Sequence, residues 1–151
     1  MVIKRRKFLK SLSLSTMYPL ANIEPSLFSN PKPTGLIEFY KKSIVIDGLI
    51  IPRGWNEDSF KALDESGYTG FSASLPSKNF RIAMSSLLKW ENKIKSNSNK
   101  LILAKSSKDF YSAKEEGKTG VLLGFQNATM IENSIENIES LYKAGTRWIQ
   151  L

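Results

Sequence analysis

Residues 101–125 read LILAKSSKDFYSAKEEGKTGVLLGF, and they contain one complete strand–helix–strand pattern. The apolar run 100–104 predicts a strand. Ser107 is the expected N-cap of a helix that ends at Gly117, and the run 119–125 predicts the next strand. Short apolar strands that alternate with amphipathic helices are typical of a parallel sheet covered by helices.

The same alternation continues on both sides of this segment. The expected elements are a strand at 43–47, a helix from Asn56 to Gly67, a strand at 68–75, a long helix with Phe80, Met84, Leu87 and Ile94 on one face, a helix capped by Asn133 and stopped by Gly145, and a strand from Thr146. The helix stopped by Gly145 is expected to bury Ile135, Ile138, Leu141 and Tyr142. The pattern is therefore a strand–helix unit repeated four times and then a fifth strand.

A doubly wound sheet, a barrel and part of a barrel all fit this order of elements. No Gly-rich phosphate loop follows the first strand, where the sequence reads Leu-Ile-Ile-Pro at 49–52, so a nucleotide site at that turn is not expected. A (β/α)₈ TIM-type barrel needs about 250 residues. We therefore expect an α/β fold that corresponds to the N-terminal half of such a barrel, over residues 35–151.

The composition excludes several kinds of chemistry. The chain has 151 residues and contains neither His nor Cys, so Ser-His-Asp and Cys-His catalysis, disulfides, and zinc held by imidazole or thiolate are impossible within it. The formal net charge is +8, and basic residues gather at the start of the chain, at Lys4, Arg5, Arg6, Lys7 and Lys10. The rest is nearly balanced, and we expect no nucleic-acid partner.

The basic start resembles a twin-arginine export signal of bacteria. The residues that carry this resemblance are Arg5, Arg6, Phe8 and Leu9. The uncharged segment 11–23 that follows is too short and too polar to span a bilayer, which needs about 20 mostly apolar residues. We expect residues 1–30 to be a signal and linker read by the export machinery, and the protein to reach the periplasm or cell envelope. The alternative is a basic arm that binds anionic surfaces.

Four segments of the chain resemble the membrane (renal) dipeptidase family of zinc metallopeptidases. They are Ile44-Val-Ile-Asp-Gly48, Gly70-Phe-Ser-Ala-Ser74, the run from Leu101 through Asp109 to Gly124, and Leu141-Tyr-Lys-Ala-Gly-Thr-Arg-Trp-Ile-Gln-Leu151. Their order and spacing carry the resemblance, which covers about residues 36–151. It implies a metal-dependent barrel that hydrolyses dipeptides, in which two zinc ions share a bridging carboxylate and activate a water molecule.

The sequence departs from this family where the family binds its metals. The His-x-Asp that follows the family's first strand corresponds to Leu49-Ile50-Ile51, and the bridging Glu corresponds to Gln126. Apolar side chains cannot ligate zinc, and a neutral amide is a poor bridge between two cations. We assign no catalytic residue and no metal ligand, and we expect this chain alone to be inactive and to bind no zinc. Two explanations stay open, a fragment of a longer product and a divergent branch of the family.

A residual pocket is expected where the strands end, since barrels place their sites there. Its candidate lining residues are Asp47, Leu49, Ile51, Gln126 and Asn127. The amides of Gln126 and Asn127 could bind a dipeptide or another small amide-containing ligand, in a non-catalytic module of the same fold. They could equally satisfy loop backbone groups. For Asp47-Gly48 the alternative is turn chemistry, and for Trp55, Trp90 and Trp148 it is packing.

Overall fold

The computed structural model describes residues 33–151. The candidate export signal (Arg5, Arg6, Phe8 and Leu9) lies outside the described residues, so export stays a prediction. The elements are α3 (Pro33–Lys42), β1 (Ile46–Ile50), α4 (Glu57–Ser66), β2 (Gly70–Ser74), α5 (Phe80–Ser96), β3 (Leu101–Leu103), α6 (Ser107–Glu115), β4 (Thr119–Phe125), the 3₁₀ turn η2 (Thr129–Ile131), α7 (Glu136–Lys143) and β5 (Thr146–Ile149).

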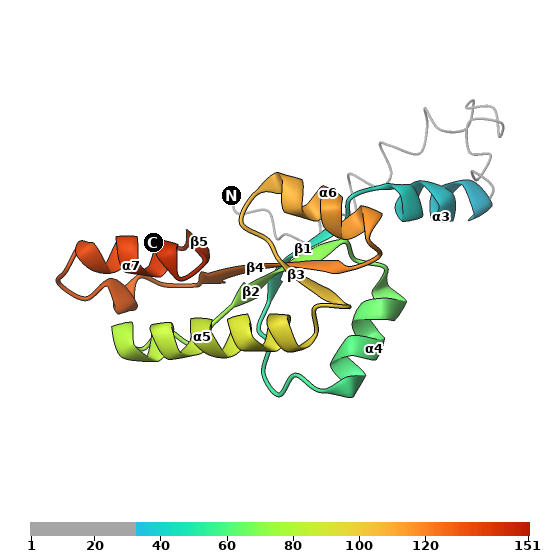
Figure 1. The fold of residues 1–151 in the computed structure, drawn as a ribbon. Helices are drawn as coiled ribbons and strands as arrows, with labels where there is room; N and C mark the ends of the chain where they lie inside the picture. Colours follow the sequence, from blue (N-terminus) through green and yellow to red (C-terminus); the bar gives the residue numbers. More distant parts are fainter. Residues whose placement is uncertain (1–32) are drawn as a thin grey trace, which may run out of the picture. The chain divides into compact units, whose positions relative to one another are not determined.

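All strand pairs in the sheet are parallel, which confirms the α/β class, and the alternating elements make up part of a TIM-type barrel (Figure 1). The strand order is not the sequential one of an ideal barrel. β4 lies next to β2, in the order β1-β2-β4-β3, and β5 also pairs with β4. Two strands therefore share one edge of β4. β3 pairs with residues 119–121 of β4, and β5 pairs with residues 123–125.

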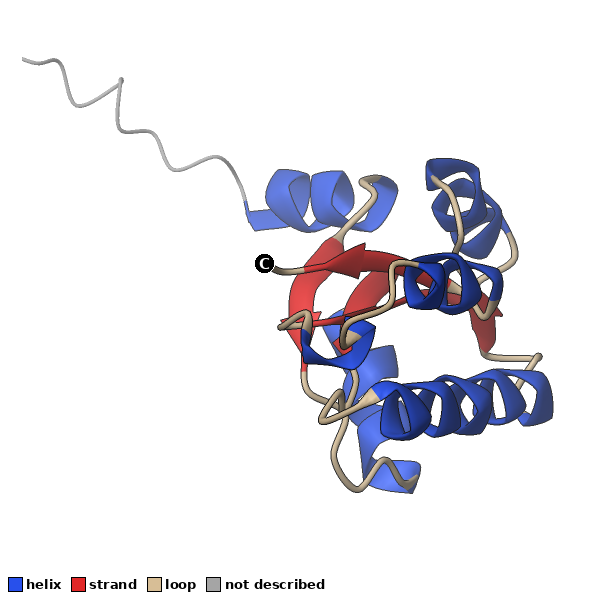
Figure 2. Cartoon of the chain, turned by 90° about the vertical axis from the view of Figure 1, so that its left-hand side faces the viewer, coloured by secondary structure: helices blue, strands red, loops and turns tan. Residues whose placement is uncertain are grey.

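The helices α4 to α7 lie on both faces of this sheet (Figure 2). α6 contacts one face, because the Phe110 ring lies where a side chain at Gly70 or Gly120 would be. The opposite face carries Phe71 and Val121, which belong to the hydrophobic core with residues of α4 and α5. Crossover connections between parallel strands are right-handed, and the step from β3 to β4 runs across the sheet in the direction opposite to the other steps. The reversed step places α6 on the other face.

The core forms between β2, β4 and the long helix α5. Its apolar side chains alternate along β2 and β4, as expected for the residues of one sheet face. The core residues with the lowest exposure are Phe71, Ala73, Ala83, Leu87, Leu101, Val121, Leu123, Phe125, Met130 and Leu141. Burying one large apolar side chain contributes about 1.5–3 kcal/mol, so this layer supplies much of the stability of the sheet.

Several element boundaries agree with the sequence pattern. Asn56 caps α4, with its side chain accepting a hydrogen bond from Ser59 N at 3.1 Å, and Gly67 ends α4 in the left-handed conformation, with φ of 68°. β4 spans residues 119–125 as predicted. The N-cap of α6 is Ser106, one residue before the predicted cap. α3 was not predicted from the sequence.

The prediction for α7 is wrong in two respects. Asn133 does not cap it, because η2 occupies the preceding loop and α7 begins at Glu136. Leu141 is buried as expected, but Ile135, Ile138 and Tyr142 are exposed by 74%, 41% and 59%. The apolar face of α7 is therefore largely open within the described part of the chain. Within residues 33–151, β5 pairs along one edge only.

The first strand starts later than predicted and passes through Asp47-Gly48. Its pairing with β2 shifts between Asp47 and Ile50, which marks a bulge. The Asp47 carboxylate accepts a hydrogen bond from Leu49 N at 2.9 Å, although both residues lie within the strand and not in a turn. Gly48 is not among the glycines with a positive φ. Among the strands of residues 33–151, β1 lies at the edge of the sheet, and Leu49 is 46% exposed.

The Arg147 side chain connects the segments around β3 and β5, the two strands that pair with the same edge of β4. Its Nε donates a hydrogen bond to Lys105 O, just after β3, at 3.1 Å. Its Nη1 donates to Tyr142 O at 2.9 Å and to Thr146 O at 2.7 Å, and the guanidinium lies 4.1 Å from the centre of the Tyr142 ring. One side chain thus joins the end of β3, the end of α7 and the start of β5.

No helix in the described part of the chain is long and apolar enough to cross a membrane.

The contact between α6 and the sheet generates a stability prediction. A Cβ atom at Gly70 would lie 2.3 Å from the Phe110 ring and 2.7 Å from the carbonyl oxygen of Gly120. We expect Gly70→Ala to lower the free energy of unfolding by at least about 2 kcal/mol, since neither the ring nor the backbone can move away freely.

The matched control is Gly48→Ala, because a Cβ atom there meets no atom within 4 Å and the φ is ordinary. We expect this control to change the free energy by less than about 0.5 kcal/mol. Urea unfolding followed by circular dichroism measures both variants. Equal stability of the two variants would contradict the described packing of α6.

Candidate functional site

A cavity of about 420 Å³ lies at the carboxyl ends of β1, β2 and β4. In a parallel sheet, the loops that follow neighbouring strands meet at this end, where ligand sites are usually found. The residues that line it are Ile51, Pro52, Arg53, Ser74, Leu75, Pro76, Ser77, Lys78, Trp90, Gln126 and Asn127.

Three of the five residues predicted from the sequence line this cavity, namely Ile51, Gln126 and Asn127. Asp47 and Leu49 do not. Both residues lie in the irregular part of β1, where the Asp47 carboxylate accepts a hydrogen bond from Leu49 N. The bulge ends at Ile50, and the cavity lining begins at the next residue, Ile51.

The orientation of the Asn127 amide is determined by its neighbours. Asn127 Oδ1 accepts hydrogen bonds from Ser77 Oγ at 3.0 Å and from Thr129 N at 3.1 Å, and Thr129 Oγ1 lies 2.6 Å away. A backbone N–H can only donate, so the atom that faces it must be the amide oxygen. The Asn127 Nδ2 group is therefore the end of the amide that remains for a ligand, and it has no hydrogen-bond partner within residues 33–151.

The same loop is joined to the start of α5. Thr129 Oγ1 lies 2.6 Å from Ser77 O, and Glu132 Oε1 accepts a hydrogen bond from Phe80 N at 3.0 Å. A carboxylate is stabilised at the N-terminus of a helix, where free N–H groups and the helix dipole point. Glu132 has a φ of 54°, an uncommon value for a residue with a side chain, and this contact helps to hold it there.

An aromatic cluster forms the wall of the cavity on the side of α5. Trp90 lines the cavity and is only 7% exposed. Behind it, Trp55 lies 5.4 Å from Trp90 in an edge-to-face arrangement and stacks on Phe71 at 5.2 Å. Trp148 lies against Gly124 on β4. The packing role predicted for the three tryptophans is confirmed, and for Trp90 it coincides with a place in the cavity wall.

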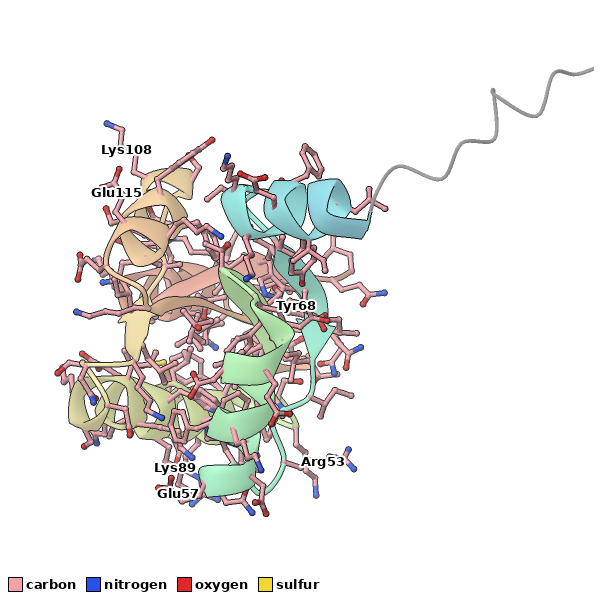
Figure 3. The ribbon with its side chains drawn as sticks, turned by 90° about the vertical axis from the view of Figure 1, so that its right-hand side faces the viewer. Arg53, Glu57, Tyr68, Lys89, Lys108 and Glu115 are labelled. Carbon is pink, nitrogen blue, oxygen red and sulfur yellow. The ribbon has the colours of Figure 1, made fainter. Side chains whose placement is uncertain are left out.

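The charged side chains of the lining are both cations. Arg53 follows β1 and Lys78 follows β2, and Figure 3 shows the Arg53 side chain extending outward from its loop. Neither makes an ion pair or a hydrogen bond with another residue of the described chain. The Gln126 side chain is also without such a partner. The cavity therefore presents cationic and amide groups, with no carboxylate among its lining residues.

The residues present do not fit a zinc site. Of the positions that correspond to the family's metal ligands, Leu49 and Ile51 are apolar and Gln126 is a neutral amide. Within residues 33–151 there is no group of three or more His, Cys, Asp or Glu side chains that could hold a metal ion. Arg53 and Lys78 would also repel a divalent cation.

Sequence reasoning missed Arg53, Ser77, Lys78 and Trp90. Arg53 lies in a Pro-Arg segment, and Ser77 and Lys78 lie in a Pro-Ser-Lys segment. Both segments are loops that follow predicted strands, and this position could have indicated a binding role. The hydrogen bond between Ser77 and Asn127 joins residues 50 positions apart, so no local pattern could reveal it.

The hydroxyl of Thr129 allows a test of the network that orients Asn127. We expect Thr129→Val to lower the free energy of unfolding by about 1–2 kcal/mol, because it removes the donor shared by Ser77 O and Asn127 Oδ1. Thr146→Val is the matched control. The Thr146 hydroxyl is buried and has no hydrogen-bond partner in the described part of the chain, so its loss is expected to be neutral or stabilising. Chemical denaturation measures both, and a larger loss in the control would contradict the network.

Comparison with known proteins places this geometry in a family. The family model for membrane dipeptidase (peptidase family M19) matches residues 55–151. No curated protein matches the chain. Among solved structures, an amidohydrolase from Pseudomonas aeruginosa is 34% identical with a TM-score of 0.72, over 76% of this chain and 35% of that one.

A second solved structure, the probable dipeptidase PvdM from Pseudomonas aeruginosa, is similar in fold, with 12% identity and a TM-score of 0.61 over 77% of this chain and 36% of that one. The chain thus spans about a third of the length of these two solved structures. Because the family model covers most of the sequence, including β2 to β5, this chain belongs to the membrane dipeptidase family, peptidase family M19.

Proposed function

We propose that the cavity at the strand ends binds a small amide-containing ligand of the dipeptide class without a metal ion. We also propose that this chain alone does not catalyse the zinc-dependent hydrolysis of dipeptides. The observation that carries the proposal is the cavity lining, in which Ile51 and Gln126 stand where the family resemblance implies metal ligands. Membership of the family supports the ligand class.

The size and chemistry of the cavity suit such a ligand. Pockets that bind small molecules commonly measure about 300–1,000 Å³ and combine apolar walls with a few polar groups. Leu75 and Trp90 supply apolar surface, and the Gln126 amide can both donate to and accept from a peptide group. No lining residue is a candidate nucleophile with an adjacent base, since the chain has no His and the cavity has no carboxylate.

Calorimetric titration of the purified chain with a panel of dipeptides tests the binding part. We expect saturable binding that is unchanged by a chelator, and a loss of about tenfold in affinity in Gln126→Ala, because a buried ligand amide would lose its partner. Asn92→Ala removes an exposed amide from α5 and is the matched control, with no expected effect. The absence of binding to every dipeptide would contradict the proposal.

The same panel with added zinc tests the inactivity. We expect no release of free amino acids above the rate of the solution without protein. Hydrolysis that requires zinc and stops on addition of a chelator would show that this chain assembles a working metal site, and the inactivity would then be wrong.

A further inference from the structure

We propose that Lys93 is a positioning residue for the cavity at the strand ends, because it anchors the loop that carries Ile51 and Arg53 into the cavity lining. This inference rests on the proposed function and names a side chain outside the lining on which ligand binding depends. Lys93 lies on α5, is partly buried and does not line that cavity, so it acts through residues that do.

The loop of residues 51–55, here called the β1–α4 loop, has few hydrogen bonds of its own. Arg53 N donates to Ile51 O at 2.8 Å, within the loop. Lys93 Nζ donates to Trp55 O at 3.2 Å. Apart from strand pairing, this is the hydrogen bond that joins the loop to another element within the described part of the chain. The Lys93 ammonium makes no ion pair with a described residue, so no carboxylate competes with the Trp55 carbonyl for it.

The Trp55 ring extends the loop into the hydrophobic core. It stacks on Phe71 at 5.2 Å, and it lies edge-to-face against Phe60 at 5.8 Å and against Trp90 at 5.4 Å. Its Nε1 atom is buried and has no hydrogen-bond partner among the described residues. Aromatic packing and the hydrogen bond from Lys93 to the carbonyl therefore hold Trp55 in place, without a contribution from the indole N–H.

The same ammonium also contacts the aromatic wall of the cavity. Lys93 Nζ lies over the Trp90 ring, 5.5 Å from its centre, and a cation over the face of an indole is attracted by the ring. Trp90 precedes Lys93 by about one turn of α5 and lines the cavity. One side chain thus fixes the β1–α4 loop and the Trp90 ring relative to each other.

The wall that Lys93 supports has open space on both of its sides. A second cavity of about 410 Å³ has Trp55 and Lys93 in its lining, and Pro52, Pro76 and Trp90 line both cavities. Close packing from behind therefore does not hold this wall. Without the Lys93 ammonium, the β1–α4 loop can move into the second cavity, and the lining residues that it carries leave their places around the ligand.

The variant Lys93→Met tests the anchor, since it keeps the apolar stem of the side chain and removes the ammonium. The ligand is alanyl-alanine, or whichever dipeptide of the panel binds most tightly, in calorimetric titration. We expect Lys93→Met to bind it about three- to tenfold more weakly than the wild-type chain. Lys93→Arg keeps a charged donor for Trp55 O and should restore the affinity to within about twofold.

The matched control is Lys89→Met. Lys89 is an exposed lysine of α5 and also lines the second cavity, but it makes no hydrogen bond or ion pair with a described residue. We expect Lys89→Met to leave the affinity unchanged. If Lys93→Met loses the wild-type circular dichroism spectrum, Lys93→Gln replaces it, because its shorter side chain also removes the ammonium from Trp55 O.

The indole ¹H–¹⁵N signals in NMR report the anchor without any ligand. We expect Lys93→Met to shift the signals of Trp55 and Trp90 and to leave that of Trp148, which lies against Gly124, in place. A general loosening of the core would move all three signals, so this pattern separates positioning from a purely structural effect.

The outcomes distinguish this inference from the proposed function. Unchanged affinity in Lys93→Met, or a loss that Lys93→Arg shares in full, would overturn the positioning role and leave the proposed function standing. An unchanged Trp55 signal in Lys93→Met would overturn the anchor itself. If the wild-type chain binds no dipeptide, the proposed function is wrong, and the role of Lys93 in ligand binding is wrong with it.

Discussion

The pairing of β4 along both of its edges is the constraint on which the rest of this structure depends. β2 pairs with one edge, and β3 and β5 divide the other edge between them. Strands can approach and helices can pack over β4 because Gly120 and Gly124 carry no side chains, and the rings of Phe110 and Trp148 fill the space above them. The shared edge is in turn tied together by the Arg147 side chain.

The position of the cavity follows from this pairing. β4 lies beside β2, so the loop that begins at Gln126 meets the loop that carries Ser77 and Lys78. The Ser77 hydroxyl and the Thr129 backbone then donate hydrogen bonds to the oxygen of Asn127 and fix the orientation of its amide. If β3 lay between β2 and β4, as in a sequential barrel, these two loops would be one strand farther apart, and the hydrogen bonds between them could not form.

Much of the fold could be predicted from local patterns, because capping and apolar periodicity are local. Asn56, Gly67 and the run 119–125 lie where those rules place them. The order of the strands could not be predicted, since it depends on contacts between distant residues such as Phe110 and Gly70. In the candidate site, Ile51, Gln126 and Asn127 could be predicted as lining residues because they lie after the ends of predicted strands. The bulge at Asp47 and the place of Arg53 in the cavity lining depend on how β1 and the loop after it pack against β2. No local sequence pattern in that loop reveals this packing.

The central claim is that this cavity binds a small amide-containing ligand of the dipeptide class without a metal ion. The most direct measurement follows the side-chain ¹H–¹⁵N signals of Asn127 by NMR while zinc or an N-acetylated dipeptide acid is added to the labelled chain. We predict that the acid shifts these signals in a saturable way and that zinc leaves them unchanged. Signals that move with zinc and not with the acid would contradict the claim.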